Sequence, residues 1–248
     1  MNAIRVIGQA ITSTNYATAR IFDFNPEPVR AMAENYLAAG IDEVEIPQGV
    51  LDPDGRSPAT GVDRERVART VGLLPRGTRV VATYLGSGSL GDDNDAYFAA
   101  ATRTLDDFCA WFPDCRFAML HPPGPSFGSP SAVQAAVDTW ARLAGRAARA
   151  RPGFQVGFHN HYDTSAESAD QVRTWLRAIE RAGEPALRWA PDTGHCHGMG
   201  EAYLEVLDAG AHLVGDFFHL KARVAAFDSR HEGARYRRPL RFPARKVR

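Results

Sequence analysis

The sequence has few cysteines, almost no lysine and no net charge. Its 248 residues include three cysteines, and 29 basic side chains balance 29 acidic ones. Three cysteines without a CxxC pair exclude a disulfide-stapled scaffold and are typical of a reducing compartment, so we expect a cytoplasmic protein. No apolar run approaches the ~18 residues of a membrane helix, and no signal peptide precedes the first strand-like run. We therefore expect no membrane association.

The zero net charge hides a basic end. Residues 221–248 carry ten basic and two acidic side chains, so the rest of the chain is mildly acidic. An acidic body argues against a surface that follows nucleic acid phosphates, and we expect no nucleic acid partner. The composition predicts one domain over residues 1–221, followed by an atypical basic C-terminal tail over residues 222–248.

Short runs rich in β-branched and aromatic residues recur along the chain, with amphipathic helical patterns between them. They start at Arg5, Glu43, Arg79, Arg116, Gln155, Leu187 and Leu213. Most are apolar on both faces, as parallel strands covered by helices are. The helical patterns carry start signals of their own, such as Ser168 ahead of the stripe that begins at Val172.

An unbroken alternation of strands and helices predicts an α/β fold with a parallel sheet. The sheet is either open and doubly wound or closed into a (β/α)8 TIM barrel. No GxGxxG motif follows the first strand, which disfavours a dinucleotide-binding fold and favours the barrel. Seven strands are readable, and at about 35 residues per unit the chain is too short for eight full units. The eighth unit is therefore short, degenerate or missing.

Polar residues gather where the predicted strands end. Asp192 follows the sixth strand, and six of the eight histidines lie at or just after strand ends, namely His121, His159, His161, His195, His197 and His219. In a barrel these ends share the face that carries the active site. Imidazoles and carboxylates are ligands that suit Zn, Mn, Fe or Co. The set as a whole predicts a site for a divalent metal or a polyhydroxy ligand, although a single histidine at such a position is more often a polar cap on a strand.

Three motifs, GFHNHYDT (157–164), APDTGH (190–195) and FFHLK (217–221), resemble those of the xylose isomerase-like TIM-barrel family. This family contains sugar isomerases and epimerases, inosose dehydratases and AP endonucleases. The likeness covers roughly residues 155–221, with Glu45 upstream. It implies that Asp192 and His219 are metal ligands and that His159 is a third, at a position where many members have Glu. No eighth strand ending in Glu is visible, which is a second departure from the family pattern.

The resemblance implies a divalent-metal-dependent sugar or polyol isomerase or epimerase that acts through an enediolate. The metal is Mn, Co, Zn or Mg, and the motifs do not distinguish between them. His161, His195 and Glu45 are candidate bases or substrate hydrogen-bond partners. Lys221, one of two lysines in the chain, is a candidate for stabilising a developing oxyanion.

Several alternatives stay open at this point. The same site would serve an inosose-type dehydratase, an AP endonuclease-like nuclease would use related ligands, and a barrel lacking one unit could be a non-catalytic subunit. The tail also has three interpretations. It closes the barrel with a ligand from Asp228, His231 or Glu232, or it leaves an open edge for a second copy or a partner subunit, or it is a truncated or frame-shifted terminus.

Overall fold

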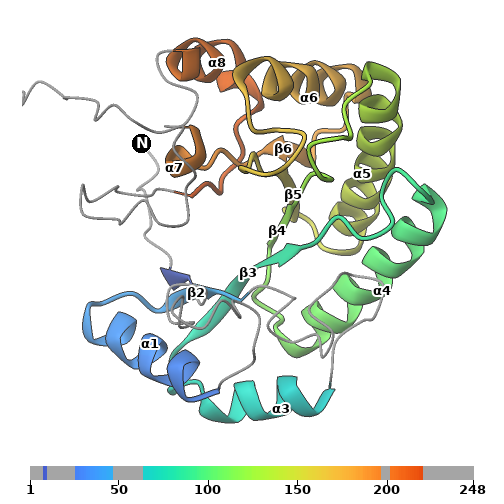
Figure 1. Ribbon diagram of the computed structural model, residues 1–248. Coiled ribbons are helices and arrows are strands. Elements are labelled where there is room, and N and C mark those ends of the chain that lie inside the picture. The colour runs from blue at the N-terminus through green and yellow to red at the C-terminus, as the bar shows by residue number, and fades with distance from the viewer. Residues whose placement is uncertain (1–7, 10–25, 47–63, 197–201, 220–248) are drawn as a thin grey trace, which may run out of the picture.

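The computed structural model describes residues 8–9, 26–46, 64–196 and 202–219, and this part of the chain forms a parallel sheet surrounded by helices (Figure 1). The sheet has six strands among the described residues, and their order in the sheet is their order in the chain. They are β1 (Gly8–Gln9), β2 (Glu43–Glu45), β3 (Arg79–Leu85), β4 (Phe117–Leu120), β5 (Gln155–Phe158) and β6 (Leu187–Trp189). Sequential parallel pairing through helical crossovers is the topology of a TIM barrel and confirms the predicted α/β class.

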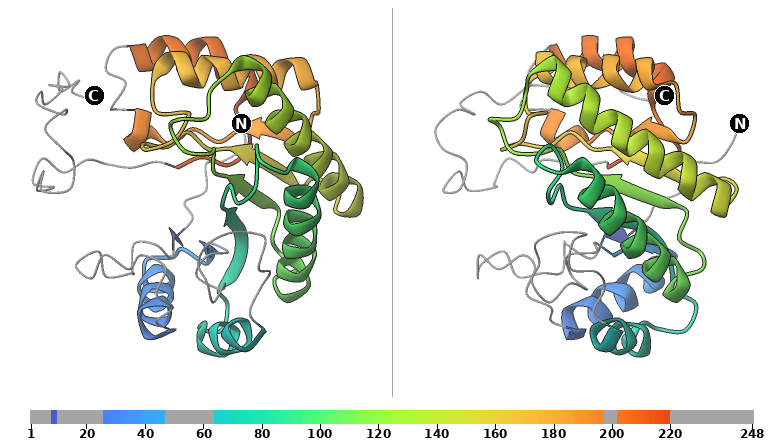
Figure 2. Two further views of the ribbon diagram at one scale, coloured as in Figure 1. Left: turned by 45° about the vertical axis from the view of Figure 1, so that its right-hand side comes forward. Right: turned by 90° about the vertical axis from the view of Figure 1, so that its right-hand side faces the viewer.

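Most helices lie in an arc on the outside of the sheet, and one four-residue helix directly follows the end of β6 (Figure 1). The helices are α1 (Pro26–Ala38), α3 (Arg64–Leu73), α4 (Asn94–Trp111), α5 (Pro130–Ala150), α6 (Ala169–Ala182), α7 (Thr193–Cys196) and α8 (Ala202–Gly210), with a 3-10 turn η4 at Ala211–Leu213. Figure 2 shows α1 beside α3 at one end of the arc and α6 beside α8 at the other. None of the described helices combines the length and the apolar character that crossing a membrane requires.

Local sequence signals fix the helix ends. Ser168 and Gln171 form a reciprocal capping box at the start of α6, and the helix ends at Gly183, which has a left-handed φ of 64°. Helix α5 begins after Ser129, whose hydroxyl accepts a hydrogen bond from the Ala132 amide. These caps place the helices so that their apolar stripes face the sheet.

Side chains along the strands divide between two cores, and the alternation is interrupted in β3, where its register to β2 shifts between Val80 and Ala82. Those that point outward meet the helices, where Phe158 stacks on Trp175 and Trp175 on Trp140, with ring centroids 5.4 and 4.8 Å apart. Those that point inward form a second cluster of Val81, Ala82, Phe117, Met119, Ala190 and Phe217. The concave side of the sheet is therefore a packed interior, as in a barrel.

Two ion pairs of one buried carboxylate, that of Glu43, lie at the amino ends of the strands. Glu43 is 2% exposed, and its Oε1 lies 3.0 Å from a guanidinium nitrogen of Arg79 and 3.0 Å from one of Arg116. Two arginines on one carboxylate tie β2 to β3 and to the start of β4. Glu43 thus has a structural role, at the opposite end of the strands from the predicted site.

The sequence predicts a seventh strand at residues 213–220, but the described residues up to His219 contain no regular strand there. Up to His219, the described part contains the turn η4 and two isolated parallel bridges, Trp189 to Val214 and Asp192 to His219. Between them the Asp216 amide donates to Gln155 Oε1 at 2.9 Å, so a side chain takes the place of a strand carbonyl. The ladder is interrupted, but His219 still lies next to Asp192.

Candidate metal centre

Asp192 is held rigidly at the end of β6 by the short helix α7. Its Oδ1 accepts hydrogen bonds from the amides of Gly194 (2.8 Å) and His195 (3.0 Å), and its carbonyl accepts from the Cys196 amide. A carboxylate in this position is a typical N-cap. The side chain is fully buried, and because Oδ1 holds the helix, Oδ2 faces the interior.

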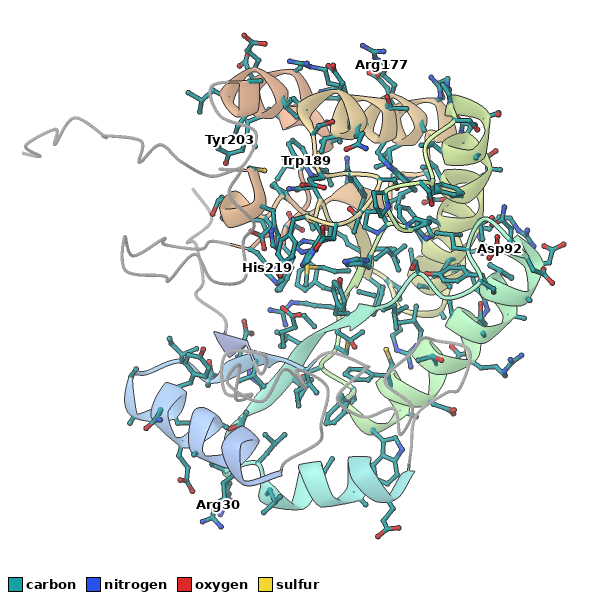
Figure 3. The ribbon with its side chains drawn as sticks, in the orientation of Figure 1. Arg30, Asp92, Arg177, Trp189, Tyr203 and His219 are labelled. Carbon is teal, nitrogen blue, oxygen red and sulfur yellow. The ribbon has the colours of Figure 1, made fainter. Side chains whose placement is uncertain are left out.

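Three imidazoles surround Asp192 Oδ2. The nearest ring nitrogens are His219 Nδ1 at 3.4 Å, His195 Nε2 at 3.6 Å and His159 Nε2 at 3.8 Å. His159 follows β5, His195 lies in α7, and His219 forms an isolated bridge with Asp192. Figure 3 shows His219 on the concave side of the sheet, inside the arc of helices. The structure thus brings together Asp192, His159 and His219, whose role as metal ligands stays a prediction.

We call His159, Asp192 and His219 the inner cluster. One ligand atom from each residue lies within 4.8 Å of the other two. Ligands about 2.0–2.2 Å from a shared cation lie about 3–4 Å from one another, so this spacing fits a divalent ion. Two imidazoles and a carboxylate are a donor set that transition metals accept.

Glu45 reaches across the interior to His219. Its Oε2 accepts a hydrogen bond from His219 Nε2 at 2.8 Å, although 174 residues separate the two in the chain. This contact requires the sheet to curve until β2 faces the segment after β6, as a barrel does. The other oxygen, Glu45 Oε1, is buried and has no hydrogen-bond partner among the described residues, so a cation or a substrate hydroxyl would satisfy it.

The two histidines of the inner cluster have pKa values shifted in opposite directions. Burial disfavours the charged ring, but the Glu45 and Asp192 carboxylates outweigh it and raise the pKa of His219 to about 9. His159 behaves in the opposite way, because burial and the nearby His219 hold its pKa well below the usual 6.5. The two opposite pKa shifts mean that the carboxylates favour positive charge at His219, while burial favours the neutral ring of His159, the form that binds a metal.

Backbone carbonyls fix the orientation of three histidines. Nδ1 of His159 faces the Ala190 carbonyl at 3.3 Å, that of His161 faces the Tyr162 carbonyl at 2.7 Å and that of His121 faces the Pro122 carbonyl at 2.9 Å. A carbonyl oxygen only accepts, so in each ring Nδ1 carries the hydrogen and Nε2 carries the lone pair. Such partners are typical of histidines that bind metals or move protons.

His161 and His195 lie side by side next to the inner cluster. Their ring centroids are 3.9 Å apart, and the ring of Tyr162 packs against both, at 4.4 and 4.7 Å. His121 contacts His161 with centroids 4.7 Å apart, and burial together with the nearby His161 lowers the pKa of His121 to about 4. His121 therefore lines the site and also anchors its own loop.

Asn160 is a site residue that the sequence prediction missed. It is fully buried, and its Oδ1 accepts hydrogen bonds from the Asp192 amide (3.1 Å) and from Trp189 Nε1 (3.2 Å). Its Nδ2 faces Cys196 Sγ at 3.2 Å. The side chain clamps the ends of β5 and β6 together, and the available signal was its position between His159 and His161.

Among the sequence-predicted residues, Glu45, His159, His161, Asp192, His195 and His219 come together at the carboxyl ends of the strands. Lys221, His197 and the tail candidates Asp228, His231 and Glu232 lie outside the described residues. The residues that would form a short or degenerate eighth unit also lie outside the described ranges. The roles assigned to these residues remain predictions.

The fold was compared with known proteins. No family model matches the sequence, and no curated protein matches it. Solved structures do match. D-allulose 3-epimerase from Methylomonas sp., in complex with D-allulose, is 20% identical with a TM-score of 0.57, over 86% of this chain and 71% of that one. A probable 3-DHS dehydratase from Bacillus anthracis is 12% identical with a TM-score of 0.56, over 85% and 70%.

A third structure is described as a xylose isomerase-like TIM barrel protein from Mycobacterium smegmatis in complex with magnesium. It is 13% identical with a TM-score of 0.57, over 89% of this chain and 76% of that one. An AP endonuclease of family 2 from Brucella melitensis has the same fold. These likenesses define the fold: the described part of the chain folds like TIM-barrel proteins, among them the xylose isomerase-like barrel, as the sequence predicted.

Proposed function

We propose that the chain is a divalent-metal-dependent isomerase or epimerase of a sugar or polyol that acts through an enediolate. The observation that carries the proposal is the set of three imidazoles within 3.8 Å of the buried Asp192 Oδ2. Epimerases and a magnesium-bound barrel among the structures of this fold support the same class of chemistry.

The inner cluster would hold the cation through His159, Asp192 and His219. When bound, a divalent ion polarises a carbonyl and stabilises the negative charge that develops on its oxygen. The hydrogen bond from His219 to Glu45 orients the imidazole and increases the basicity of its other nitrogen, Nδ1, which faces Asp192. The α7 amides on Asp192 Oδ1 keep Oδ2 directed at the same point.

In this proposal His161 and His195 are the residues that transfer protons. The Tyr162 carbonyl holds the Nδ1 hydrogen of His161, so Nε2 is the atom that takes a proton from the carbon next to the carbonyl. His195, with its ring 3.9 Å away, would return a proton to the neighbouring carbon or to the opposite face. In this proposal Glu45 positions His219 instead of acting as the base, and Lys221 keeps its proposed role at the oxyanion.

The test is solvent exchange with a panel of ketohexoses, ketopentoses and inososes. We expect the chain loaded with Mn²⁺ or Co²⁺ in D₂O to incorporate deuterium at the carbon next to the carbonyl and to form an epimer or an aldose. Asp192→Asn should abolish exchange, because it removes the ligand charge while its side-chain oxygen can still accept the α7 hydrogen bonds. His212→Gln is the matched control, since His212 is an exposed histidine paired with Glu180 away from the site.

The outcomes separate the alternatives. Exchange accompanied by loss of water would assign a dehydratase that uses the same first step. Metal binding without exchange on any member of the panel would contradict the proposal and favour a non-catalytic barrel. Exchange that persists unchanged in Asp192→Asn would show that another site carries the chemistry.

A further inference from the structure

A second group of possible ligands lies beside the inner cluster. His159, His161 and His195 each present one ring nitrogen within 4.8 Å of the other two, and we call them the outer cluster. Their ring centroids are 3.9 Å apart for His161 and His195, 5.8 Å for His159 and His161, and 6.0 Å for His159 and His195. The three ligand atoms of the outer cluster are all imidazole nitrogens, with Asp192 Oδ2 lying 3.6 Å from His195 Nε2, whereas the inner cluster contains that carboxylate as a member.

The carbonyl contacts decide which nitrogens face this group. In His159 and His161 Nδ1 donates to a backbone carbonyl, so both rings turn an Nε2 lone pair away from that carbonyl. Tyr162, although 45% exposed, lays its ring against His161 and His195 and shields one side of them. Histidines that bind metals commonly donate their other ring nitrogen to a backbone carbonyl, as His159 and His161 do here.

The two clusters share His159, and this residue cannot serve both at once. Its Nδ1 is held by the Ala190 carbonyl, and Nε2 has a single lone pair. An ion in the outer cluster therefore takes His159 away from the inner one. Ions bound at the two clusters therefore compete for Nε2 of His159.

We propose that the outer cluster is a second metal site, selective for zinc-like ions, that competes with the inner cluster for His159. Three neutral imidazoles suit Zn²⁺ and related transition ions, while Mn²⁺ and Mg²⁺ favour sites with carboxylate oxygens. Zn²⁺ bound there withdraws one ligand from the ion of the inner cluster. Zn²⁺ bound there would also occupy the ring nitrogens that the proposed function assigns to proton transfer, so the two roles exclude each other at any one moment. The inference concerns metal binding alone and is tested by metal affinity, without the sugar chemistry proposed above.

The test compares Zn²⁺ and Mn²⁺ affinities of the full chain by competition with chelators of known affinity. His161 belongs to the outer cluster only, and Asp192 belongs to the inner cluster only. We expect His161→Gln to weaken Zn²⁺ binding by at least about tenfold, the effect of losing even an outer partner of a ligand, and to leave Mn²⁺ binding unchanged. Asp192→Asn should weaken Mn²⁺ binding by at least as much and should affect Zn²⁺ binding less.

Thermal unfolding of each variant verifies that it is folded, and His212→Gln should match the wild type with both metals. Equal losses of Zn²⁺ and Mn²⁺ affinity in His161→Gln, or no loss of Zn²⁺ affinity, would overturn the outer site. A wild type that binds Zn²⁺ with this selectivity but shows no exchange with any sugar would leave the outer site standing and contradict only the proposed function.

Discussion

Gly157 tests the link between the packed interior and the metal centre. It lies in β5 with its Cα facing the interior, and a Cβ added there would be 2.8 Å from Ala190 Cβ. Carbon atoms in contact prefer about 3.5–4.0 Å. Ala190 has no flexible side chain to move aside, and its amide is bonded to the Phe158 carbonyl at 2.8 Å. In Gly157→Ala, therefore, β5 and β6 must separate.

We expect this overpacking to lower the free energy of unfolding by about 1–3 kcal/mol. For a chain of this size, that corresponds to a melting temperature lower by about 2–12 °C. His159 and Asp192 each lie two residues beyond the point of contact, so the separation also widens the 3.8 Å gap between their ligand atoms and weakens metal binding.

The assay is thermal and urea unfolding followed by circular dichroism, with metal affinity measured on the same samples. Gly128→Ala is the control, because a Cβ at Gly128 meets nothing within 4 Å, and we expect its stability to stay within about 0.5 kcal/mol of the wild type. A Gly157→Ala variant with wild-type stability and metal affinity would refute the reasoning that close packing of β5 on β6 sets the site geometry.

Two further predictions concern titration and thiol reactivity. Burial lowers the pKa of His121 to about 4 in the folded chain, whereas the ordinary value in the unfolded chain is 6.5. The unfolded chain therefore binds one more proton between these values, and the free energy of unfolding falls as the pH drops from 6.5 toward 4. Urea unfolding of His121→Gln should show a shallower fall with pH, and a fall identical to that of the wild type would contradict the prediction. Cys109, Cys115 and Cys196 are buried, and burial raises the pKa of Cys196 to about 12, so Ellman's reagent should label the native chain far more slowly than the urea-unfolded chain; rapid labelling without urea would contradict these positions.

Much of the fold follows from the sequence because its signals are local. Strand runs flanked by helical stripes, and caps such as Ser168 with Gln171, need only neighbouring residues to be recognised. The convergence of His159, Asp192 and His219 was also predictable, because parallel strands carry their ends to one edge of the sheet. The positions of His159 and Asp192 follow from the assignment of β5 and β6, whereas His219 lies beside Asp192 through an isolated bridge.

The contacts that the sequence did not reveal are long-range or specific to side chains. Glu45 bonds His219 only because the sheet curves, and no local pattern encodes the contact. Asn160 clamps two strand ends through side-chain geometry, which alternation alone does not predict. The prediction of a regular seventh strand was wrong over the described residues, because the Gln155 side chain accepts the hydrogen bond of the Asp216 amide in place of a strand carbonyl.

The central claim is that side chains from separate strand ends hold one divalent cation. Its most direct test is elemental analysis of the chain after equilibration with Mn²⁺ or Zn²⁺ and removal of excess metal, on the wild type, Asp192→Asn and His212→Gln. The account predicts about one ion per chain in the wild type and in His212→Gln, and little metal in Asp192→Asn after Mn²⁺ loading. A wild type that retains neither metal, or an Asp192→Asn variant that retains as much Mn²⁺ as the wild type, would contradict it.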